Sequence, residues 1–172
     1  MSDQIYWIHG SWPGRLAIVA RPRGGDWLEA ESRSWARSGL DVIVSLLTSE
    51  EAAEFGLAEE AAFGRLNGIE FLNFPIPDRG VPASREDTVK LVMALAGYVA
   101  AGKNVGIHCR QGIGRSGLIG ACLLLTSGMA PQIAFTELSE ARGCPVPETM
   151  EQRQWVEAFA PQLAAAVAKA RP

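Results

Sequence analysis

Apolar positions along the chain fall into two patterns, and their alternation predicts a series of strands and helices. Compact runs rich in Val, Ile and Leu, flanked by turn residues, are typical of strands. Such runs predict strands at Ile5 to His9, Arg15 to Arg21, Asp41 to Leu47, Ile69 to Phe74 and Asn104 to His108. The third run is uniformly apolar, which is typical of a strand buried on both faces of a sheet.

Between these runs, apolar residues recur at helical spacing and are bracketed by capping residues. Asp26, with Glu29 three residues later, predicts a capping box at the start of a helix that ends near Gly39. The Ala- and Glu-rich segment 50–65 predicts one or two short helices broken near Gly56. Further helices are predicted from Ser84 to Gly102, from Ser116 to Ser127, from Pro131 to Arg142 and from about Thr149 to Ala170, the last interrupted near Pro161.

Strands that alternate with helices predict an α/β fold with a central, mostly parallel sheet flanked by helices on both faces. The 172 residues fit one domain, residues 1–172, since no repeat, linker or low-complexity tract divides them. In such sheets ligands bind beyond the carboxyl ends of the strands. Cys109 directly follows the last predicted strand and is therefore expected at that edge.

Charge and hydropathy narrow the classes of partner. A net charge of −3 argues against nucleic acid or an anionic membrane, since proteins that bind either carry a basic face. Met1 to Trp12 lacks the basic stretch and apolar core of a signal peptide. The uncharged stretch from Ser116 to Thr136 is broken by glycines and Pro131, so its unbroken apolar part is too short to span a bilayer.

The chemistry is concentrated in one segment, His108 to Gly117, between a predicted strand and a predicted apolar helix. Backbone N–H groups of a Gly-rich loop at a helix N-terminus converge on anions. The same surroundings favour a thiolate, so Cys109 is predicted to be a nucleophile beneath a bound oxyanion. Arg115 can bind two phosphate oxygens at once. The segment predicts a site that breaks phosphate esters.

The pattern His-Cys-x-x-Gly-x-x-Arg-Ser in this segment resembles the signature of the protein tyrosine phosphatase superfamily. Its spacing is similar to that of the compact dual-specificity branch, including the kinase-associated phosphatase type. The resemblance implies a cysteinyl-phosphate intermediate on Cys109, with Arg115 and the loop amides binding the phosphoryl oxygens. The amides in question belong to Arg110, Gln111, Gly112, Ile113, Gly114 and Arg115.

A phosphatase of this kind also needs an acid that protonates the leaving group. Asp78 is the predicted acid, because it lies in an irregular, proline-rich segment between a strand end and a helix cap. The segment is also similar to the general-acid loop of compact dual-specificity phosphatases. The alternative is that Pro-Asp-Arg-Gly only forms a β-turn, in which Asp bonds to the backbone.

Three more positions take roles from the resemblance. The Ser116 hydroxyl is predicted to bond to the Cys109 sulfur and to assist its departure. His108 is predicted to orient the cysteine through backbone hydrogen bonds. Gln152 is predicted to place the hydrolytic water, with Gln154 as the second choice. Glu148 stands where some relatives have glutamine, which leaves that assignment open.

Three cysteines without a Cys-x-x-Cys pair, and only two histidines, favour neither a disulfide framework nor a metal site, so no cofactor or metal is expected. A nucleophilic thiolate needs a reducing compartment, which indicates the cytoplasm. Cys122 is expected to be core filler, and a redox role for Cys144 stays open.

The expected substrate is a phosphorylated protein or peptide that carries phosphotyrosine, and whether phosphoserine and phosphothreonine are also substrates stays open. The chain is too short for the large tyrosine-specific domain, so a shallow, permissive site is expected. Three alternatives stay open: a phosphatase for phosphoinositides or RNA 5′ ends, a sulfurtransferase or arsenate reductase, and a module that only binds phosphorylated motifs.

Overall fold

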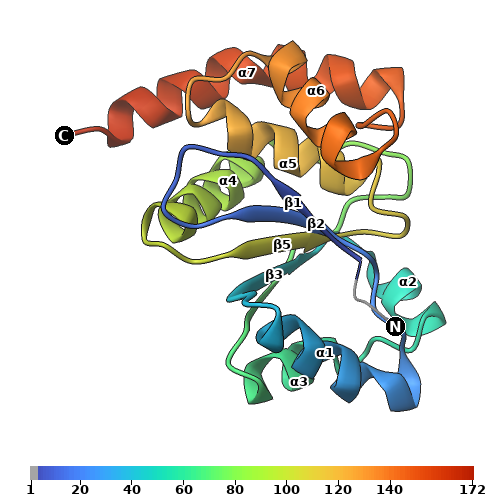
Figure 1. Ribbon diagram of the computed structural model, residues 1–172. Coiled ribbons are helices and arrows are strands. Elements are labelled where there is room, and N and C mark those ends of the chain that lie inside the picture. Colours follow the sequence, from blue (N-terminus) through green and yellow to red (C-terminus); the bar gives the residue numbers. More distant parts are fainter. Residues whose placement is uncertain (1–3) are drawn as a thin grey trace.

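A five-stranded sheet forms the centre of the protein (Figure 1), in a computed structural model that describes residues 4–172. Its order is β1-β2-β5-β3-β4, and only β1 runs antiparallel to its neighbour β2. The strands are β1 (Ile5–Ile8), β2 (Leu16–Val19), β3 (Val42–Ser45), β4 (Glu70–Asn73) and β5 (Val105–His108). All five predicted strands and the mostly parallel sheet are confirmed.

The three inner strands β2, β5 and β3 are buried at every residue, which explains why their sequences are mostly apolar. β5 lies in the middle of the sheet and pairs in parallel with both β2 and β3. The segment that follows β5 therefore emerges at the centre of the sheet's carboxyl edge.

Helices cover both faces of the sheet (Figure 1). α4 to α7 lie on one face, whereas α1 and α3 lie on the other. The helices are α1 (Leu28–Arg37), α2 (Ser49–Glu54), α3 (Glu60–Leu66), α4 (Arg85–Ala100), α5 (Arg115–Leu125), α6 (Pro131–Arg142) and α7 (Met150–Ala170), with a 3₁₀ helix η1 (Gly25–Trp27) before α1. The larger apolar core lies beneath α4 to α7, and a smaller core around Trp35 lies beneath α1.

The predicted capping box at Asp26 and Glu29 is wrong. Asp26 lies in η1, and α1 begins at Leu28 without a side-chain cap. The preceding backbone is instead tied to another part of the chain, since the Gly25 N–H donates to the carbonyl of Gly56 at 3.0 Å. This long-range contact sets the local geometry and leaves Glu29 free to pair with Arg33.

The predicted interruption at Pro161 is also wrong, because α7 continues through this residue. A proline removes one backbone donor, but Phe159 and Leu163 on either side are buried in the core. Their packing holds both halves of the helix together.

Segment 116–136 forms the buried helix α5, a turn and the start of α6, as predicted. None of the helices in residues 4–172 is long and apolar enough to span a membrane. The predicted single domain, residues 1–172, includes three N-terminal residues that lie outside the described part.

Candidate active site

The loop between β5 and α5, residues 109–114, surrounds the Cys109 sulfur and is called the cysteine loop below. Cys109 is only 2% exposed, and its Sγ accepts hydrogen bonds from Ser116 Oγ at 2.8 Å and from the Gly112 N–H at 3.3 Å. Donors in this arrangement stabilise negative charge on sulfur. The arrangement can therefore support a nucleophilic thiolate.

Two features hold the backbone of the cysteine loop in shape. Gly112 has a φ of +70°, a conformation that would strain any side chain there. Arg142, the last residue of α6, donates from Nε to the Gly112 carbonyl at 2.8 Å and from Nη2 to the Gln111 carbonyl at 3.2 Å. Because C=O and N–H of a trans peptide point in opposite directions, the following N–H groups are directed away from Arg142. Arg142 was not predicted, since an arginine at a helix end carries no specific signal.

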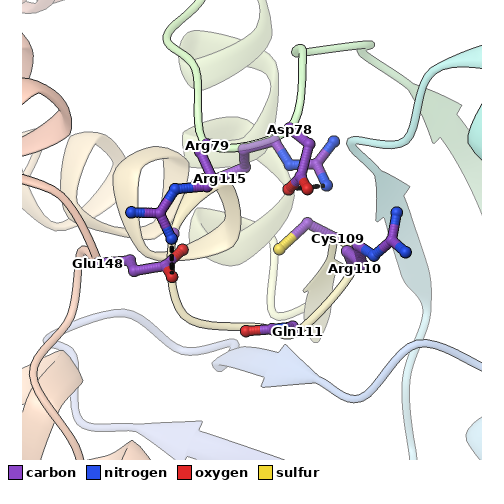
Figure 2. A pocket seen from close by; sticks show the side chains of 8 residues that line it. Asp78, Arg79, Cys109, Arg110, Gln111, Arg115 and Glu148 are labelled. Atoms are coloured by element: carbon purple, nitrogen blue, oxygen red, sulfur yellow. Dashed lines mark hydrogen bonds and ion pairs between the residues drawn. The ribbon is translucent and has the colours of Figure 1, made fainter.

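Arg115 begins α5 and lies beside Cys109 (Figure 2) with its side chain almost completely buried. Glu51 binds its guanidinium end-on, with Nη1–Oε2 at 2.7 Å and Nη2–Oε1 at 2.8 Å. Nη1 also donates to the Ile76 carbonyl at 2.8 Å. Burial by itself lowers the pKa of Arg115. The Glu51 hydrogen bond and the nearby Cys109 and Asp78 outweigh this effect, and the pKa of Arg115 is raised overall.

Glu51 is a site residue that sequence reasoning missed. Its carboxylate accepts from the Thr48 N–H at 3.0 Å while the Thr48 hydroxyl accepts from the Glu51 N–H, so the pair forms the capping box of α2. The Arg115 hydrogen bond is the main reason that the pKa of Glu51 is lowered. The Thr-x-x-Glu pattern after β3 was a usable signal for the cap, although not for the partner.

Asp78 lies on the rim opposite Cys109, where Oδ1 accepts a hydrogen bond from Arg115 Nη2 at 3.0 Å (Figure 2). Its segment does form the β-turn considered from sequence, with the Gly80 N–H donating to the Pro77 carbonyl at 2.8 Å. The Asp78 carboxylate contacts Arg115, 37 residues away, and the Asp78 side chain is half exposed. The segment therefore forms a β-turn and also places the Asp78 carboxylate next to Arg115.

These residues line a pocket of about 70 Å³ at the carboxyl edge of the sheet. Arg79 and Glu148, which face each other across its rim in Figure 2, were not predicted as site residues. The complete lining is Asp78, Arg79, Cys109, Arg110, Gln111, Gly114, Arg115 and Glu148. The pocket thus combines a buried sulfur, three guanidinium groups and two carboxylates.

Gln152 and Gln154 differ sharply in position. Gln152 is completely buried; its Nε2 donates to the Gly80 carbonyl at 3.1 Å, and its Oε1 accepts from the Thr149 N–H in the capping box of α7. A side chain added at Gly114 would come within 3.0 Å of the Gln152 amide. Gln154 is exposed on α7. Of the two glutamines, Gln152 is therefore the one next to the cysteine loop.

His108 is buried behind the cysteine loop. Its Nε2 lies 2.6 Å from Oε1 of the buried Glu60, and its ring packs against Trp35 with centroids 6.0 Å apart. Within the described residues, its Nδ1 has no hydrogen-bond partner. The imidazole thus contacts α3, and the predicted backbone role in orienting Cys109 stays a prediction.

The other two cysteines are both free thiols. Cys122 lies in the core, where burial raises its pKa. Cys144 is partly exposed and packs against the edge of the larger core. In residues 4–172 no cluster of His, Cys, Asp or Glu could hold a metal ion.

Comparison with known sequences gives a match over nearly the whole chain. Residues 4–167 match the family described as Swiss Army Knife protein, DSP-PTPase phosphatase domain. Cyclin-dependent kinase inhibitor 3 of Rattus norvegicus is 28% identical over 140 residues, which cover 80% of this chain and 66% of the relative. The Homo sapiens protein of that name is 30% identical over 132 residues, covering 74% and 60%. The chain thus covers less than two thirds of the length of these two relatives, 66% and 60%.

The structure is also similar to solved structures. Kinase associated phosphatase, crystallised with its catalytic-site cysteine changed to serine, has a TM-score of 0.87 at 23% identity, covering 96% of this chain and 98% of that chain. Tk-PTP in its active form has a TM-score of 0.74 at 30% identity, covering 96% and 99%. These likenesses confirm the predicted fold.

Proposed function

The chain belongs to the DSP-PTPase phosphatase domain family, and from this premise we propose that it is a cysteine-dependent phosphatase for phosphorylated proteins. Its substrates carry phosphotyrosine, and the shallow pocket also admits phosphoserine and phosphothreonine. The observation that carries the proposal is the Cys109 sulfur, which receives two hydrogen bonds at the base of a pocket lined by Arg115 and Asp78.

In the first step, the Cys109 thiolate attacks phosphorus, an S–P bond forms and the P–O bond to the leaving group breaks. Asp78 gives its proton to the departing oxygen. In the second step, water attacks the cysteinyl-phosphate, the S–P bond breaks and Asp78 takes the proton from the water. The Ser116 hydroxyl stabilises the departing thiolate, and Gln152 is proposed to place the water from the N-terminus of α7.

The free donors of Arg115 support a specific mode of phosphate binding. Both Nη atoms donate to Glu51, Nη1 also to the Ile76 carbonyl and Nη2 to Asp78. Nε has no such bond in the described part of the chain, and its neighbour Nη2 is shared between Glu51 and the half-exposed Asp78. The edge of the guanidinium formed by Nε and Nη2 is therefore the one proposed to bind phosphate. Phosphate that takes this edge replaces Asp78, which is then free to face the leaving group.

The cysteine loop supplies the remaining donors in the proposal. Backbone N–H groups from Arg110 to Arg115 bind the equatorial oxygens of the transferring phosphoryl group, and fixed donors of this kind need no reorganisation during the reaction. We propose a single catalytic domain over residues 1–172, working in the cytoplasm without a metal or cofactor. The similarity to cyclin-dependent kinase inhibitor 3 supports protein substrates.

The test is a panel of phosphopeptides with phosphotyrosine, phosphoserine or phosphothreonine, incubated with the parent chain, Cys109→Ser and Asp78→Asn. The parent is expected to release phosphate and Cys109→Ser to release none. Asp78→Asn is expected to lower kcat by about 100-fold or more, since general acid catalysis contributes about that much. It should also abolish the fall in rate on the alkaline side of the pH profile.

Inositol phosphates, 5′-triphosphorylated RNA, thiosulfate and arsenate are included to test the alternative activities. Faster turnover of one of these than of every phosphopeptide would replace the proposed substrate. Full activity of Cys109→Ser would refute the mechanism. Binding of phosphopeptide without turnover by the parent would indicate a binding module.

A further inference from the structure

We infer that the ion pair between Arg79 and Glu148 is a clasp that holds the acid loop, residues 77–80, in the position where Asp78 faces the pocket. Arg79 is then a positioning residue for the reaction and Glu148 its counter-charge. The inference rests on the proposed function, because it assigns a task to residues beside the proposed acid.

The two residues come from segments that are far apart in sequence. Arg79 lies between β4 and α4, and Glu148 lies just before α7, yet Arg79 Nη1 and Glu148 Oε1 are 2.6 Å apart. Figure 2 shows the pair spanning the pocket rim, with Asp78 directly preceding Arg79 on the same loop. The contact therefore ties the residue next to the proposed acid to the opposite side of the pocket.

The backbone of Arg79 points to a function for its side chain. Arg79 has a φ of +58°, and it is the one non-glycine residue with positive φ in residues 4–172. Glycine would adopt this conformation without strain, whereas other residues rarely adopt it because their Cβ makes it unfavourable. A strained arginine at this turn is accounted for if its guanidinium makes a useful contact, and Glu148 is that contact.

A second tie joins the same two segments. Gln152 Nε2 donates to the Gly80 carbonyl at 3.1 Å, and Gln152 is buried against the cysteine loop at Gly114. Glu148 lies at the same place, since a side chain added at Gly114 would come within 3.2 Å of its Oε2. The start of α7 thus connects the acid loop to the cysteine loop, through a buried hydrogen bond and an exposed ion pair.

The pair also has an electrostatic consequence for the pocket. Glu148 is a carboxylate in the wall of a pocket proposed to bind a phosphate dianion, and by itself it would repel that dianion. Arg79 cancels this charge at 2.6 Å. Removing only Arg79 therefore exposes a repulsive charge, whereas removing only Glu148 frees a cation.

The experiment compares the parent with Arg79→Gly, Glu148→Gln and the double variant on two substrates. Phenyl phosphate has a poor leaving group and depends on an acid, whereas p-nitrophenyl phosphate has a good one and depends on it less. Glycine at position 79 is compatible with the positive φ of the turn. Glu148→Gln breaks the same ion pair without changing the backbone of the acid loop. Thermal unfolding checks that each variant is folded.

Each single variant is expected to lower kcat for phenyl phosphate by about three- to fivefold, because an exposed ion pair contributes at most about 1 kcal/mol. For p-nitrophenyl phosphate the loss should stay below about 1.5-fold. The double variant should be no slower than either single variant. KM is expected to rise in Arg79→Gly but not in Glu148→Gln, and high salt should slow only the parent.

The matched control is Arg33→Ala, which removes an exposed ion pair with Glu29 of the same 2.6 Å length on α1 and should change nothing. Parent-like kcat of Arg79→Gly on phenyl phosphate would overturn the inference, because the turn alone would then position Asp78. Equal losses on both substrates would also overturn it. A parent chain that hydrolyses neither substrate nor any phosphopeptide would instead refute the proposed function on which the inference rests.

Discussion

At the scale of single residues, the two hydrogen bonds to the Cys109 sulfur differ in kind. One comes from the Gly112 backbone and cannot be removed by substitution, whereas the other comes from the Ser116 side chain at 2.8 Å. The sulfur is negatively charged as the attacking group and again as the departing group, but it is neutral in the intermediate. A donor to sulfur therefore favours the thiolate, which assists the second step most.

Ser116→Ala is expected to slow hydrolysis of the cysteinyl-phosphate more than its formation. A hydrogen bond to a charged group contributes about 1.5–3 kcal/mol, so the second step should slow roughly 10- to 100-fold. Rapid-mixing assays with p-nitrophenyl phosphate should then show a burst of nitrophenol followed by a slow steady rate. The matched control is Ser32→Ala, since Ser32 is equally buried but its hydroxyl has no hydrogen-bond partner among residues 4–172. A lower rate without a burst would contradict this role of Ser116.

At the scale of elements, sequence patterns predicted every strand and the helices α1 to α7, because apolar spacing and the turn residues between segments marked each of them. Ser84 caps α4 as predicted, and Thr149, the predicted start of the last helix, caps α7. The failures at Asp26 and Pro161 arose where packing with distant residues outweighed a local preference. α2 is the most informative case, because Glu51 of its capping box also binds Arg115.

Glu51→Gln is expected to destabilise the fold at neutral pH, because it leaves the buried Arg115 charge without its main counter-ion. Breaking a buried pair costs about 3–5 kcal/mol. Because the pKa of Glu51 is lowered from 4.5 in the folded state, its stabilisation is present above pH 4.5 and is lost as pH falls through the lowered pKa. Free energies of unfolding in urea should therefore differ most near pH 7 and converge in acid.

The control for this substitution is Glu29→Gln, which removes the exposed partner of Arg33 and should cost less than about 1 kcal/mol. A difference between Glu51→Gln and the parent that stays constant down to strongly acidic pH would show that the ionised carboxylate is not what stabilises Arg115.

At the scale of the whole molecule, the site is assembled from segments that meet only in the folded chain. Cys109, Arg115 and Ser116 were predictable because they form one contiguous motif. Glu51, Arg142 and Glu148 were not predicted, since each comes from a separate element and each contact spans 30 residues or more. The sheet brings these segments together, and β5 in its centre carries the cysteine loop.

Gly106, in the middle of β5, lies in close contact with side chains on one face of the sheet. A Cβ at this position would lie 2.7 Å from Val19 Cγ2, 2.9 Å from Ile43 Cδ1 and 3.2 Å from Leu40 Cδ2. These neighbours belong to the smaller core beneath α1. An added methyl group must therefore displace buried side chains or β5 itself.

Gly106→Ala is expected to lower the free energy of unfolding by about 1–3 kcal/mol, the usual cost of overpacking a core. Because β5 leads directly into Cys109, kcat should fall as well, even under conditions where the variant is fully folded. Gly97→Ala makes the same chemical change on α4, where the added methyl would meet no described atom within 4 Å apart from neighbouring backbone of its own helix, and should instead stabilise by about 0.5–1 kcal/mol. Urea unfolding and phosphopeptide turnover distinguish the two. A Gly106→Ala variant as stable and active as the parent would mean that the side chains of the smaller core rearrange to accommodate the methyl group. The position of the cysteine loop would then not depend on tight packing beneath β5.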